Sequence, residues 1–348
     1  PFNGRSGCMH CGHCMYFGCE VGAKSSTLAA MIPLAEATGR CEIRDRSAVF
    51  RIETDASGRA REVLYYDKDG NEQGQLAKAV IVSANGAETP RLLFLSASER
   101  HPDGLANSSG FVGRNLMLNA HGLVNGVFEH QLNDYKSVQV SKIIHDFYEN
   151  DESRGFYGGG GIDARPLFSA TPIFHSILGM PPDVPKWGKA WKDAFAHNFT
   201  RQMSIVASTT SLAMDRNNVT LDPKNTDQWG RPSLRTTYRD HDDDLSLGRF
   251  GVGKCEELMD AAGAQEQWAF AVTPSTGGAH LLGTARMGDD PASSVVDPYH
   301  RSHDVPNLFI CDGSSLVTSG RGQPTMTIMA LAFRAAEHIA AAAKANQI

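Results

Sequence analysis

The sequence lacks three features that would assign it to a simple class. It has no excess of positive charge, since 33 Lys and Arg face 39 Asp and Glu for a formal net charge of −6, and this argues against a nucleic-acid-binding surface. It has no uninterrupted apolar run of membrane-spanning length. The longest apolar stretch, 326–345, contains Arg334, Glu337, His338 and Lys344, so we predict no transmembrane segment. The G-x-G-x-x-G fingerprint of dinucleotide-binding folds is also missing.

The chain begins at Pro1, without an initiator Met and without a recognisable signal peptide. We expect Pro1 to be an internal residue of a longer protein. With 348 residues, 41% hydrophobic and 21% charged, the chain has the composition of a soluble globular protein of one or two domains. Its 34 glycines exceed the usual share of about 7%, which predicts many tight turns and close backbone approaches.

Hydrophobic patterning predicts a mixed α/β fold. Partial alternation indicates strands at 41–54 and 62–67, and the apolar run 79–84 is typical of a strand buried on both faces, followed by a Gly turn and a short helix. Further predicted elements are strands at 203–215, 218–222, 233–239 and 307–313, a helix over 241–263 with an acidic first turn, and a long helix from Pro324. The four glycines of 158–161 are interpreted as a flexible or closely packed loop, because the run lacks the pattern of a phosphate loop.

Four of the seven cysteines lie within twelve residues, in CMHCGHCMYFGC: Cys8, Cys11, Cys14 and Cys19. This C-x2-C-x2-C-x4-C spacing is close to that of iron–sulfur ligands, one residue longer and without the following Pro. Three alternatives stay open. The thiolates could bind zinc together with His10 or His13, two cysteines could form a local disulfide, or the cysteines could only pack a Gly-rich loop. The remaining three, Cys41, Cys255 and Cys311, are scattered and are predicted to be inert.

Two segments near the carboxyl end combine reactive and small residues. His280 stands in a Gly-rich turn, which would present an imidazole to a cavity, although a single His is more often structural. A second Gly-rich loop leads through Gln323 and Pro324 into a helix, whose N-terminus offers free N–H groups to an anion. Asp312 and Gly313 follow a predicted buried strand, a position at which α/β sheets place ligand contacts.

These residues carry a resemblance to the glucose–methanol–choline (GMC) oxidoreductases, which are FAD-dependent. The matching pieces are H-x-x-GT-x-x-MG (280–288), VVDP-x-x-R (295–301), NL-x-x-x-DGS (307–314) and the helix sequence 324–339. Upstream, 80–96 resembles the second signature of the family, and 111–121, 22–39 and 48–52 resemble further family segments. The Cys-rich opening is most similar to cytochrome- or dye-linked bacterial members, such as glucoside 3-dehydrogenase catalytic subunits and gluconate 2-dehydrogenase large subunits.

The resemblance implies roles for individual residues. His280 corresponds to the catalytic histidine, and Gln323 falls on the second catalytic position, where the family has His or Asn. Gln can hold a substrate hydroxyl by hydrogen bonding but cannot act as a base near neutral pH. FAD contacts are implied for Val49, Asp312, Gly313, Pro324 and Thr325, and the four clustered cysteines are implied ligands of a 3Fe-4S or 4Fe-4S cluster.

The resemblance also implies an organisation and an activity. Residues 1–115 would form part of the Rossmann-like FAD-binding domain with the Cys-rich loop at 8–19, residues 116–276 an antiparallel-sheet substrate domain, and 277–348 the rest of the FAD-binding domain. The N-terminal ADP-binding segment of the family is absent from this sequence. The implied reaction oxidises a CH–OH group of a sugar, glycoside or polyol by hydride transfer to the flavin, with electrons passing through the cluster to a cytochrome c-type acceptor.

Partners and alternatives follow from the same resemblance. We expect a small subunit beside the cytochrome, no nucleic acid, and a location in the bacterial periplasm, with the cytoplasm left open. Three other functions stay possible: a cluster-free alcohol oxidase or dye-linked dehydrogenase, a GMC-fold lyase that keeps FAD without redox turnover, and a non-catalytic fragment.

Overall fold

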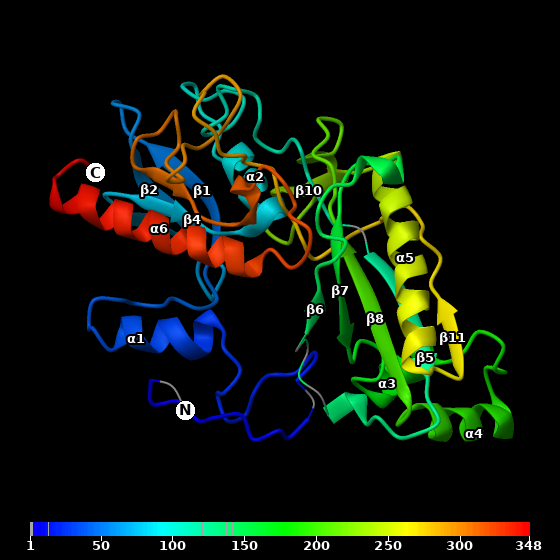
Figure 1. The fold of residues 1–348 in the computed structure, drawn as a ribbon. Coiled ribbons are helices and arrows are strands. Elements are labelled where there is room, and N and C mark those ends of the chain that lie inside the picture. Colours follow the sequence, from blue (N-terminus) through cyan, green and yellow to red (C-terminus); the bar gives the residue numbers. More distant parts are fainter. Residues whose placement is uncertain (1–2, 13, 120, 137, 139, 141) are drawn as a thin grey trace. The chain divides into compact units, whose positions relative to one another are not determined.

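The computed structural model describes residues 3–12, 14–119, 121–136, 138, 140 and 142–348 (Figure 1). The chain divides into two compact units, and each unit is assembled from three separate segments of the sequence. Unit 1 comprises Pro1–Ile43, His121–Thr209 and Leu245–Thr273; unit 2 comprises Arg44–Ala120, Thr210–Asp244 and Pro274–Ile348. Pro1, the expected internal residue, and His13, an alternative zinc ligand, lie outside the described residues.

Unit 1 is built on an antiparallel sheet with strand order β11-β5-β8-β7-β6. Its strands are β5 (His121–Val127), β6 (Ile143–Ile144), β7 (Gly160–Arg165), β8 (Gln202–Thr209) and β11 (Glu266–Ala269). Helix α5 (Asp242–Ala262) packs its apolar side against one face of this sheet, where Cys255 and Met259 meet buried strand residues such as Val124 and Ile205.

Glycines allow α5 to lie close to the sheet. A Cβ on Gly122 of β5 would come within 3.0 Å of the Gly248 carbonyl oxygen, and a Cβ on Gly251 of α5 would lie 2.7 Å from the Ala207 methyl group. Real Cβ atoms do not tolerate such separations in a packed core, so these positions require glycine. Part of the glycine excess is therefore explained by helix–sheet packing.

The other face of this sheet is polar although it is buried. Asn125 and Ser204 are opposite each other on β5 and β8, both 0% exposed, and the Ser204 hydroxyl donates to the Asn125 amide oxygen at 2.7 Å. On β7, the buried Arg165 guanidinium forms a two-bond ion pair with Asp163.

The helical segments of unit 1 besides α5 are short. They are η1 (Thr27–Met31), α1 (Ile32–Glu36), η2 (Asp134–Lys136), η3 (Glu152–Arg154), α3 (Pro172–Phe174), η4 (His175–Gly179) and α4 (Gly188–Asn198). The side chain of Ser26 caps η1, and that of Thr171 caps α3, by accepting a hydrogen bond from a backbone N–H.

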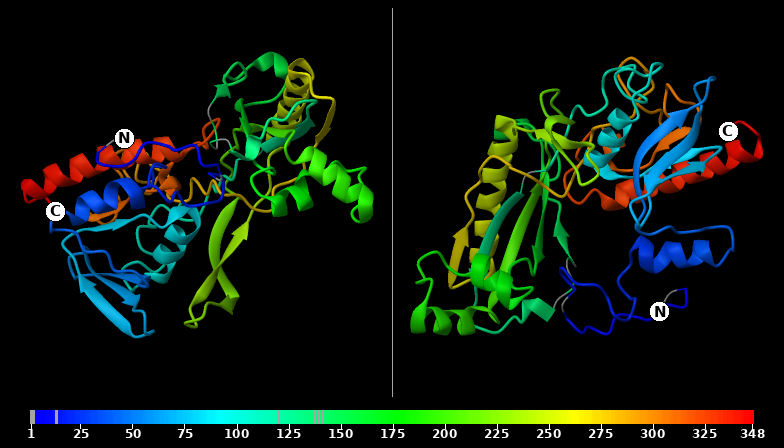
Figure 2. Two further views of the ribbon diagram at one scale, coloured as in Figure 1. Left: turned by 90° about the horizontal axis from the view of Figure 1, so that it is seen from below. Right: turned by 180° about the vertical axis from the view of Figure 1, so that it is seen from behind.

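Unit 2 combines a three-stranded antiparallel sheet, a parallel strand pair and a two-stranded ribbon (Figure 2). Its strands are β1 (Ala48–Thr54), β2 (Ala60–Tyr66), β3 (Glu72–Leu76), β4 (Val80–Val82), β9 (Asn218–Thr226), β10 (Pro232–Thr237) and β12 (Leu308–Ile310). Its helices are α2 (Asn85–Leu95), η5 (Gly313–Ser315) and α6 (Thr325–Lys344). The parallel pair β4–β12 joins segments that lie more than two hundred residues apart in the sequence.

One buried amide connects the pieces of unit 2. Asn307, 1% exposed, donates from its amide nitrogen to the carbonyls of Ala60 and Lys78, both at 2.7 Å, and its amide oxygen accepts from the Ala60 N–H at 2.8 Å. These bonds tie the entry of β12 to β2 and to the segment that leads into β4. The apolar core around them includes Ile52, Leu93, Leu105, Val296 and Leu308.

The mixed α/β fold with an antiparallel-sheet part, predicted from the sequence, is confirmed. The helices predicted at 241–263 and from Pro324 are α5 and α6, with Pro324 at the N-cap, and the predicted strand 79–84 is β4. Two predictions are wrong in detail. Ile81 is 53% exposed, so β4 is not buried on both faces, and the predicted Gly loop 158–161 enters β7 at Gly160.

The glycine run is packed closely, which confirms one of the two alternatives given for it, although its second half is a strand and not a loop. A Cβ on Gly159 would lie 2.2 Å from the Tyr148 carbonyl oxygen, and one on Gly160 would lie 2.5 Å from that of Ser208. Sequence reasoning treated consecutive glycines as loop residues because glycine weakens strands in general. Here the absence of side chains lets neighbouring backbone approach, and that gain outweighs the entropic cost.

Helix α6 is long and apolar enough to cross a membrane by length and composition, with 20 residues and a mean hydropathy of 1.2. Among the described residues it is the single helix that meets this criterion. A core helix of a soluble protein meets it too, so the expectation of no membrane span stays a prediction. The boundaries 1–115, 116–276 and 277–348 likewise stay a prediction for the protein as a whole.

Candidate active site

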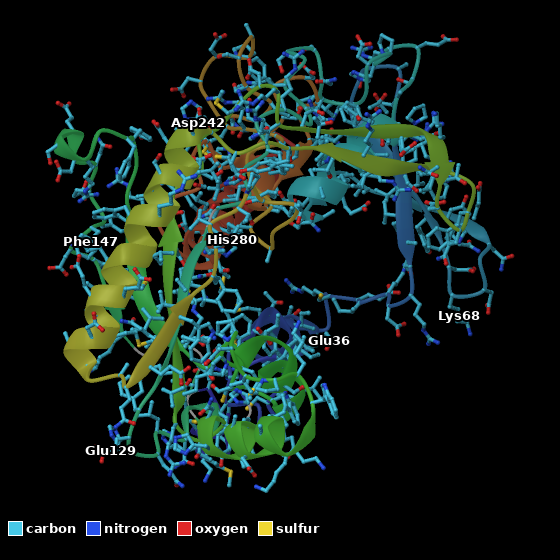
Figure 3. All side chains as sticks on the ribbon, turned by 90° about the vertical axis from the view of Figure 1, so that its right-hand side faces the viewer. Glu36, Lys68, Glu129, Phe147, Asp242 and His280 are labelled. Atoms are coloured by element: carbon cyan, nitrogen blue, oxygen red, sulfur yellow. The ribbon has the colours of Figure 1, made fainter. Side chains whose placement is uncertain are left out.

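The two residues predicted to be catalytic lie side by side in unit 2. The Nε2 atom of His280 is 3.0 Å from the Oε1 atom of Gln323, although 43 residues separate them in the sequence. His280 is half-buried, and its side chain is labelled in Figure 3. In this contact the amide oxygen of Gln323 can only accept, so Nε2 of His280 donates; a substrate hydroxyl that displaced this bond could pass its proton to Nε2 in the other tautomer and accept from the amide NH2 group.

The loop that carries His280 is fixed on both sides. Before it, the Ser275 N–H donates to the buried Asp240 carboxylate at 2.5 Å. After it, Leu282 exchanges two backbone hydrogen bonds with Met117, and Gly283 adopts φ +90°, where a Cβ would lie 2.2 Å from the Asn115 carbonyl oxygen. The imidazole is therefore placed by backbone contacts close to it on each side.

The loop that carries Gln323 is held by residues that the sequence analysis did not single out. The amide nitrogen of Asn119 donates to the carbonyls of Ser319, at 3.5 Å, and Gly322, at 3.4 Å. The Ser319 hydroxyl accepts from the Ser211 N–H at 2.8 Å and donates to the Ser211 carbonyl at 3.2 Å. Asn119 and Ser319 are 4% and 1% exposed, so these bonds are shielded from water. Asn119 ends the motif RNLMLN, but no neighbouring residue in the sequence indicated which carbonyl groups its side chain would contact.

Further polar groups stand behind this loop. The hydroxyls of Ser211 and Tyr238 lie 2.9 Å apart, and burial raises the pKa of Tyr238 well above its ordinary value. Asp244 accepts from the Leu212 and His241 N–H groups, and its pKa is raised by burial in spite of these bonds. Tyr238 is thereby kept a neutral hydroxyl that hydrogen-bonds without adding charge.

Asp312, a predicted FAD contact, has its carboxylate fully engaged inside the protein. One oxygen accepts from the Asn85 N–H at 3.0 Å and from the Thr89 hydroxyl at 2.6 Å; the other accepts from the N–H of Ser314 at 2.8 Å and from its hydroxyl at 2.5 Å. These four bonds use the acceptor positions of a carboxylate. Asp312 therefore joins the start of α2 to η5.

Gly313, the next residue, is required by packing. A Cβ there would meet the Leu282 side chain at 2.7 Å and the Leu281 carbonyl at 3.1 Å. Of the other predicted FAD contacts in unit 2, Val49 and Thr325 are exposed and Pro324 is buried. Val49 is 47% exposed beside a register shift in the β1–β2 pair, while Pro324 and Thr325 cap and begin α6. Whether these residues contact FAD stays a prediction.

The Cys-rich segment belongs to unit 1. Cys11, Cys14 and Cys19 line one hollow of about 720 Å³ together with Lys24, whose ammonium donates to the Cys14 carbonyl at 2.8 Å. The pKa of Cys19 is lowered chiefly because its sulfur accepts from the Lys24 N–H, at 3.4 Å, which favours a thiolate. Cys8 does not line the hollow; its sulfur accepts from the His10 N–H at 3.4 Å.

The described residues do not gather three or more His, Cys, Asp or Glu side chains at metal-binding separations. All seven cysteines are free thiols, so the local disulfide considered from the sequence is not formed. Burial raises the pKa of Cys255 to about 12 and that of Cys311 to about 11, which suits the inert role predicted for them. Cys41 is exposed.

Comparison with protein families gives two matches. Residues 3–121 match the amino-terminal family model and residues 213–332 the carboxy-terminal family model, both described as GMC oxidoreductase. Together they cover more than half of the chain. The stretch between the two models, 122–212, contains none of the family motifs found in the sequence.

Curated relatives and solved structures agree with these matches. The chain is 37% identical over 326 residues to 2-methyl-1,2-propanediol dehydrogenase from Mycolicibacterium austroafricanum, covering 92% of this chain and 58% of that protein. It is 32% identical to the fructose dehydrogenase large subunit from Gluconobacter japonicus, covering 97% and 60% respectively. Pyridoxine 4-oxidase from Mesorbium loti shares the fold, with a TM-score of 0.58 at 16% identity over 84% of this chain and 57% of that one.

The chain thus spans less than two thirds of the length of each of these proteins. His280 and Gln323 both fall within the matched carboxy-terminal range, and their catalytic roles stay a prediction. The motifs around His280 and Asp312 and the first part of α6 lie within the matched carboxy-terminal range, and the Cys-rich segment and α2 lie within the amino-terminal one. On this basis the chain belongs to the GMC oxidoreductase family.

Proposed function

We propose that this chain supplies the catalytic part of an FAD-dependent oxidoreductase that oxidises a CH–OH group of a sugar, glycoside or polyol. The observation that supports this most directly is the 3.0 Å approach of His280 Nε2 and Gln323 Oε1. An acid–base side chain and an orienting amide are the groups that alcohol oxidation needs from the protein.

The residues around this pair suit the isoalloxazine of FAD. Helix α6 starts immediately after Gln323, its N-cap Pro324 makes no side-chain hydrogen bond, and the N-terminal amides of a 20-residue helix favour negative charge. Around the preceding loop, a Cβ on Gly320 or Gly322 would meet no atom within 4 Å, so the space next to these two glycines is open. When bound, FAD supplies the acceptor for the hydride of the substrate carbon.

The protein side chains would divide the remaining work. For His280 to accept the hydroxyl proton at Nε2, its neutral ring must carry its own proton on Nδ1 when the substrate arrives. Gln323 would donate its amide N–H to the substrate oxygen, keeping it in line with His280. The dipole of α6 would stabilise negative charge that develops next to its N-terminus.

Replacing His280 by Ala tests this assignment in the full-length protein. We expect turnover of the alcohol substrate to fall by about 10²–10⁴-fold with the flavin content unchanged, because a general base is lost and no FAD contact is predicted for this residue. Gln323→Asn should retain part of the activity, since Asn keeps the amide at shorter reach. Full activity of His280→Ala would disprove the assignment.

We further propose that Cys8, Cys11, Cys14 and Cys19 ligate a 3Fe-4S or 4Fe-4S cluster. Three of these thiols surround one hollow, and the backbone N–H groups directed at Cys19 stabilise a thiolate, as cluster ligation requires. When bound, such a cluster supplies single-electron transfer to a cytochrome c-type acceptor, which would be carried with a small subunit in the bacterial periplasm. The fructose dehydrogenase relative is named as a large subunit, which is in keeping with a partner subunit.

Iron, sulfide and flavin quantification on the full-length protein tests the cluster. Three or four irons per flavin and a broad absorbance beyond the flavin bands are expected, and Cys14→Ser should lower both while Cys41→Ser, in an exposed cysteine outside the cluster segment, should not. Iron at background level would leave the second candidate, a cluster-free dehydrogenase or oxidase. The failure to find three gathered ligands among the described residues favours that alternative.

A further inference from the structure

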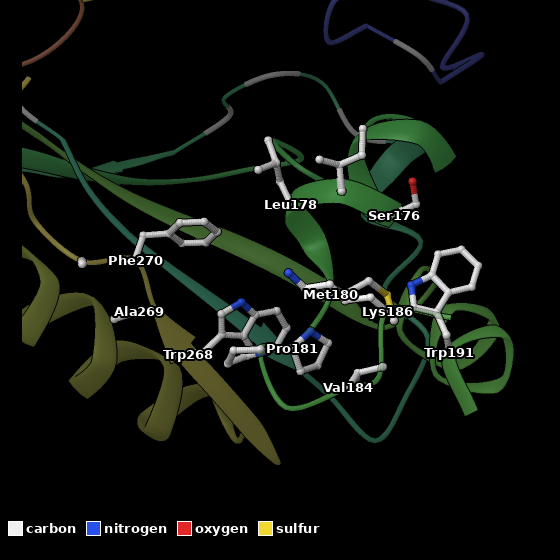
Figure 4. A pocket seen from close by; sticks show the side chains of 13 residues that line it. Ser176, Leu178, Met180, Pro181, Val184, Lys186, Trp191, Trp268, Ala269 and Phe270 are labelled. Carbon is white, nitrogen blue, oxygen red and sulfur yellow. The ribbon is translucent and has the colours of Figure 1, made fainter. Parts of the chain in front are cut away.

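Unit 1 contains a pocket that is separate from the residues assigned above. Its volume is about 620 Å³, and it is lined mainly by Trp191, Trp268, Phe270, Met180 and Pro181, with Lys186 among the remaining residues (Figure 4). Ligand pockets in proteins commonly have volumes of about 300–1,000 Å³ and mostly apolar walls with a few polar groups. The size and lining of this pocket fall in that class.

The aromatic walls are held in place from behind. Trp268 lies on β11 opposite Asn125, so its side chain is on the sheet face away from α5. The Phe270 ring packs on Phe168 with centroids 5.2 Å apart, and the Trp191 ring stacks on Phe195 at 5.3 Å. Because the far side of each ring is supported, the near side is free to contact a ligand without repacking.

The segment η4 forms a further wall of the pocket and is also held in place. His175 is fully buried with its ring edge-on to Phe195 and Phe199, and a Cβ at Gly179 would lie 2.5 Å from its Nδ1 atom. The turn η4 between these two residues presents Ser176, Ile177 and Leu178 to the pocket. The pocket is therefore built by three elements with their own internal contacts.

The polar groups of the pocket are few. Lys186 is the single charged residue of its lining, and the described residues place no ion-pair partner on its ammonium. The other side-chain hydrogen-bonding groups are the Ser176 hydroxyl and the two indole N–H groups, which are too few for the many hydroxyls of a bare sugar. Indole faces favour flat rings, and the ammonium favours a negative charge.

We propose that this pocket binds a flat aromatic molecule that carries an anionic group, with its ring between Trp268 and Trp191 and its charge at Lys186. Such chemistry could belong to an aromatic acid portion of the alcohol substrate or to an anionic quinone that serves as electron acceptor. The binding itself does not depend on the proposed oxidation, while the choice between these two sources does.

Calorimetric titration of the full-length protein with naphthalene-2-sulfonate tests the binding. We expect a Kd on the order of 100 µM, which matches the affinity per atom usual for small ligands. Trp268→Ala should weaken binding by about tenfold or more, and Trp268→Phe, which keeps an aromatic wall, by about threefold or less. Trp187→Ala is the matched control, because Trp187 is 83% exposed and does not line the pocket.

The charge is tested separately. Lys186→Gln, in an exposed residue that does not support the fold, should weaken binding of naphthalene-2-sulfonate about fivefold and leave binding of the neutral naphthalene-2-sulfonamide unchanged. Equal affinities of the Trp268→Ala and Trp187→Ala proteins, or no heat of binding at all, would overturn the proposal. A Lys186→Gln protein that binds the sulfonate as tightly as its parent would overturn the assignment of the charge.

Two kinetic experiments decide whether the ligand is part of the alcohol substrate or the electron acceptor. If the ligand is part of the substrate, naphthalene-2-sulfonate should inhibit anaerobic flavin reduction competitively with the alcohol substrate, and Trp268→Ala should weaken this inhibition. If it is the acceptor, 1,2-naphthoquinone-4-sulfonate should take two electrons from the reduced flavin and two protons to form the quinol, with the same variant raising its KM. A loss of all flavin reduction with intact calorimetric binding would reject the proposed oxidation and leave the pocket standing.

Discussion

The carboxylate of Asp312 allows a quantitative test of what holds unit 2 together. In Asp312→Asn, one carboxylate oxygen becomes an NH2 group. If the NH2 group takes the place of one oxygen, it faces the Thr89 hydroxyl and the Asn85 backbone N–H; if it takes the place of the other, it faces the hydroxyl and the backbone N–H of Ser314. A hydroxyl can rotate and accept from the NH2 group, but a backbone N–H cannot accept. Either orientation of the amide therefore leaves a backbone N–H without its acceptor, the fully buried one of Ser314 or the partly buried one of Asn85.

The magnitude follows from that geometry. An unsatisfied buried N–H costs about 1–3 kcal/mol, and hydrogen bonds to a charged group are worth about 1 kcal/mol more than neutral ones. Burying a neutral amide in place of a carboxylate, which is 7% exposed here, recovers part of this loss. Because the amide can turn its NH2 group towards the partly buried Asn85 N–H, we expect a net destabilisation of about 1–2 kcal/mol.

Thermal unfolding of the full-length protein, followed by far-ultraviolet circular dichroism, measures this change. Asp222→Asn is the matched control, because an amide oxygen can keep the bonds from the Lys224 and Asn225 backbone N–H groups and only the surface bond from the Asn225 side chain is lost. If Asp312→Asn melts at the same temperature as Asp222→Asn, the four-bond account of Asp312 is refuted.

Three other perturbations have definite expected outcomes. Burial lowers the pKa of His175 from 6.5 to about 4, so the unfolded chain binds more protons than the folded chain between pH 6.5 and pH 4. The free energy of unfolding of the parent therefore falls as the pH is lowered through this range. His175→Leu removes this loss, so its melting temperature relative to that of the parent should increase when the pH is lowered from 6.5 to 4. Burial raises the pKa of Asp134 from 3.8 to about 6, so charging it costs stability as the pH rises, and Asp134→Asn, which can still accept from the Ser169 hydroxyl, should stabilise the protein above pH 6 and lose this gain towards pH 4 in the same melting experiment. Asn119→Ala removes the amide that holds the Gln323 loop and should lower kcat about tenfold or more with the flavin retained, as measured by steady-state kinetics, whereas unchanged kcat would show that the loop is fixed without it.

Local features of the sequence predicted the elements whose determinants are close together in the chain. The acidic first turn of α5, the Pro at the start of α6 and the turn between β1 and β2 are all set by neighbouring residues. The strand β5, by contrast, was missed, because its two glycines weaken a strand pattern and are explained only by the helix that packs against them. The Gly run at the start of β7 was misinterpreted for the same reason.

The residues of the candidate site also fall into those that the sequence predicted and those that only the structure identified. Motif resemblance predicted His280, Gln323, Asp312 and Gly313, and the structure brings the first two within hydrogen-bonding distance. The motifs gave no indication that the Asp312 carboxylate accepts hydrogen bonds from α2 and η5, nor that Asn119 holds the loop before Gln323.

The sequence by itself determined the family, the residue types at the site and the helices and turns that depend on neighbours in the chain. The tertiary structure alone decided which distant groups meet: the imidazole with the amide across 43 residues, Asn307 with Ala60 across 247, and Trp268 with Trp191 around one pocket. The physical reason is the range of the interactions. Capping, periodicity and turn formation act over a few residues, whereas close packing and buried hydrogen bonds are satisfied only once the separate segments of each unit have come together.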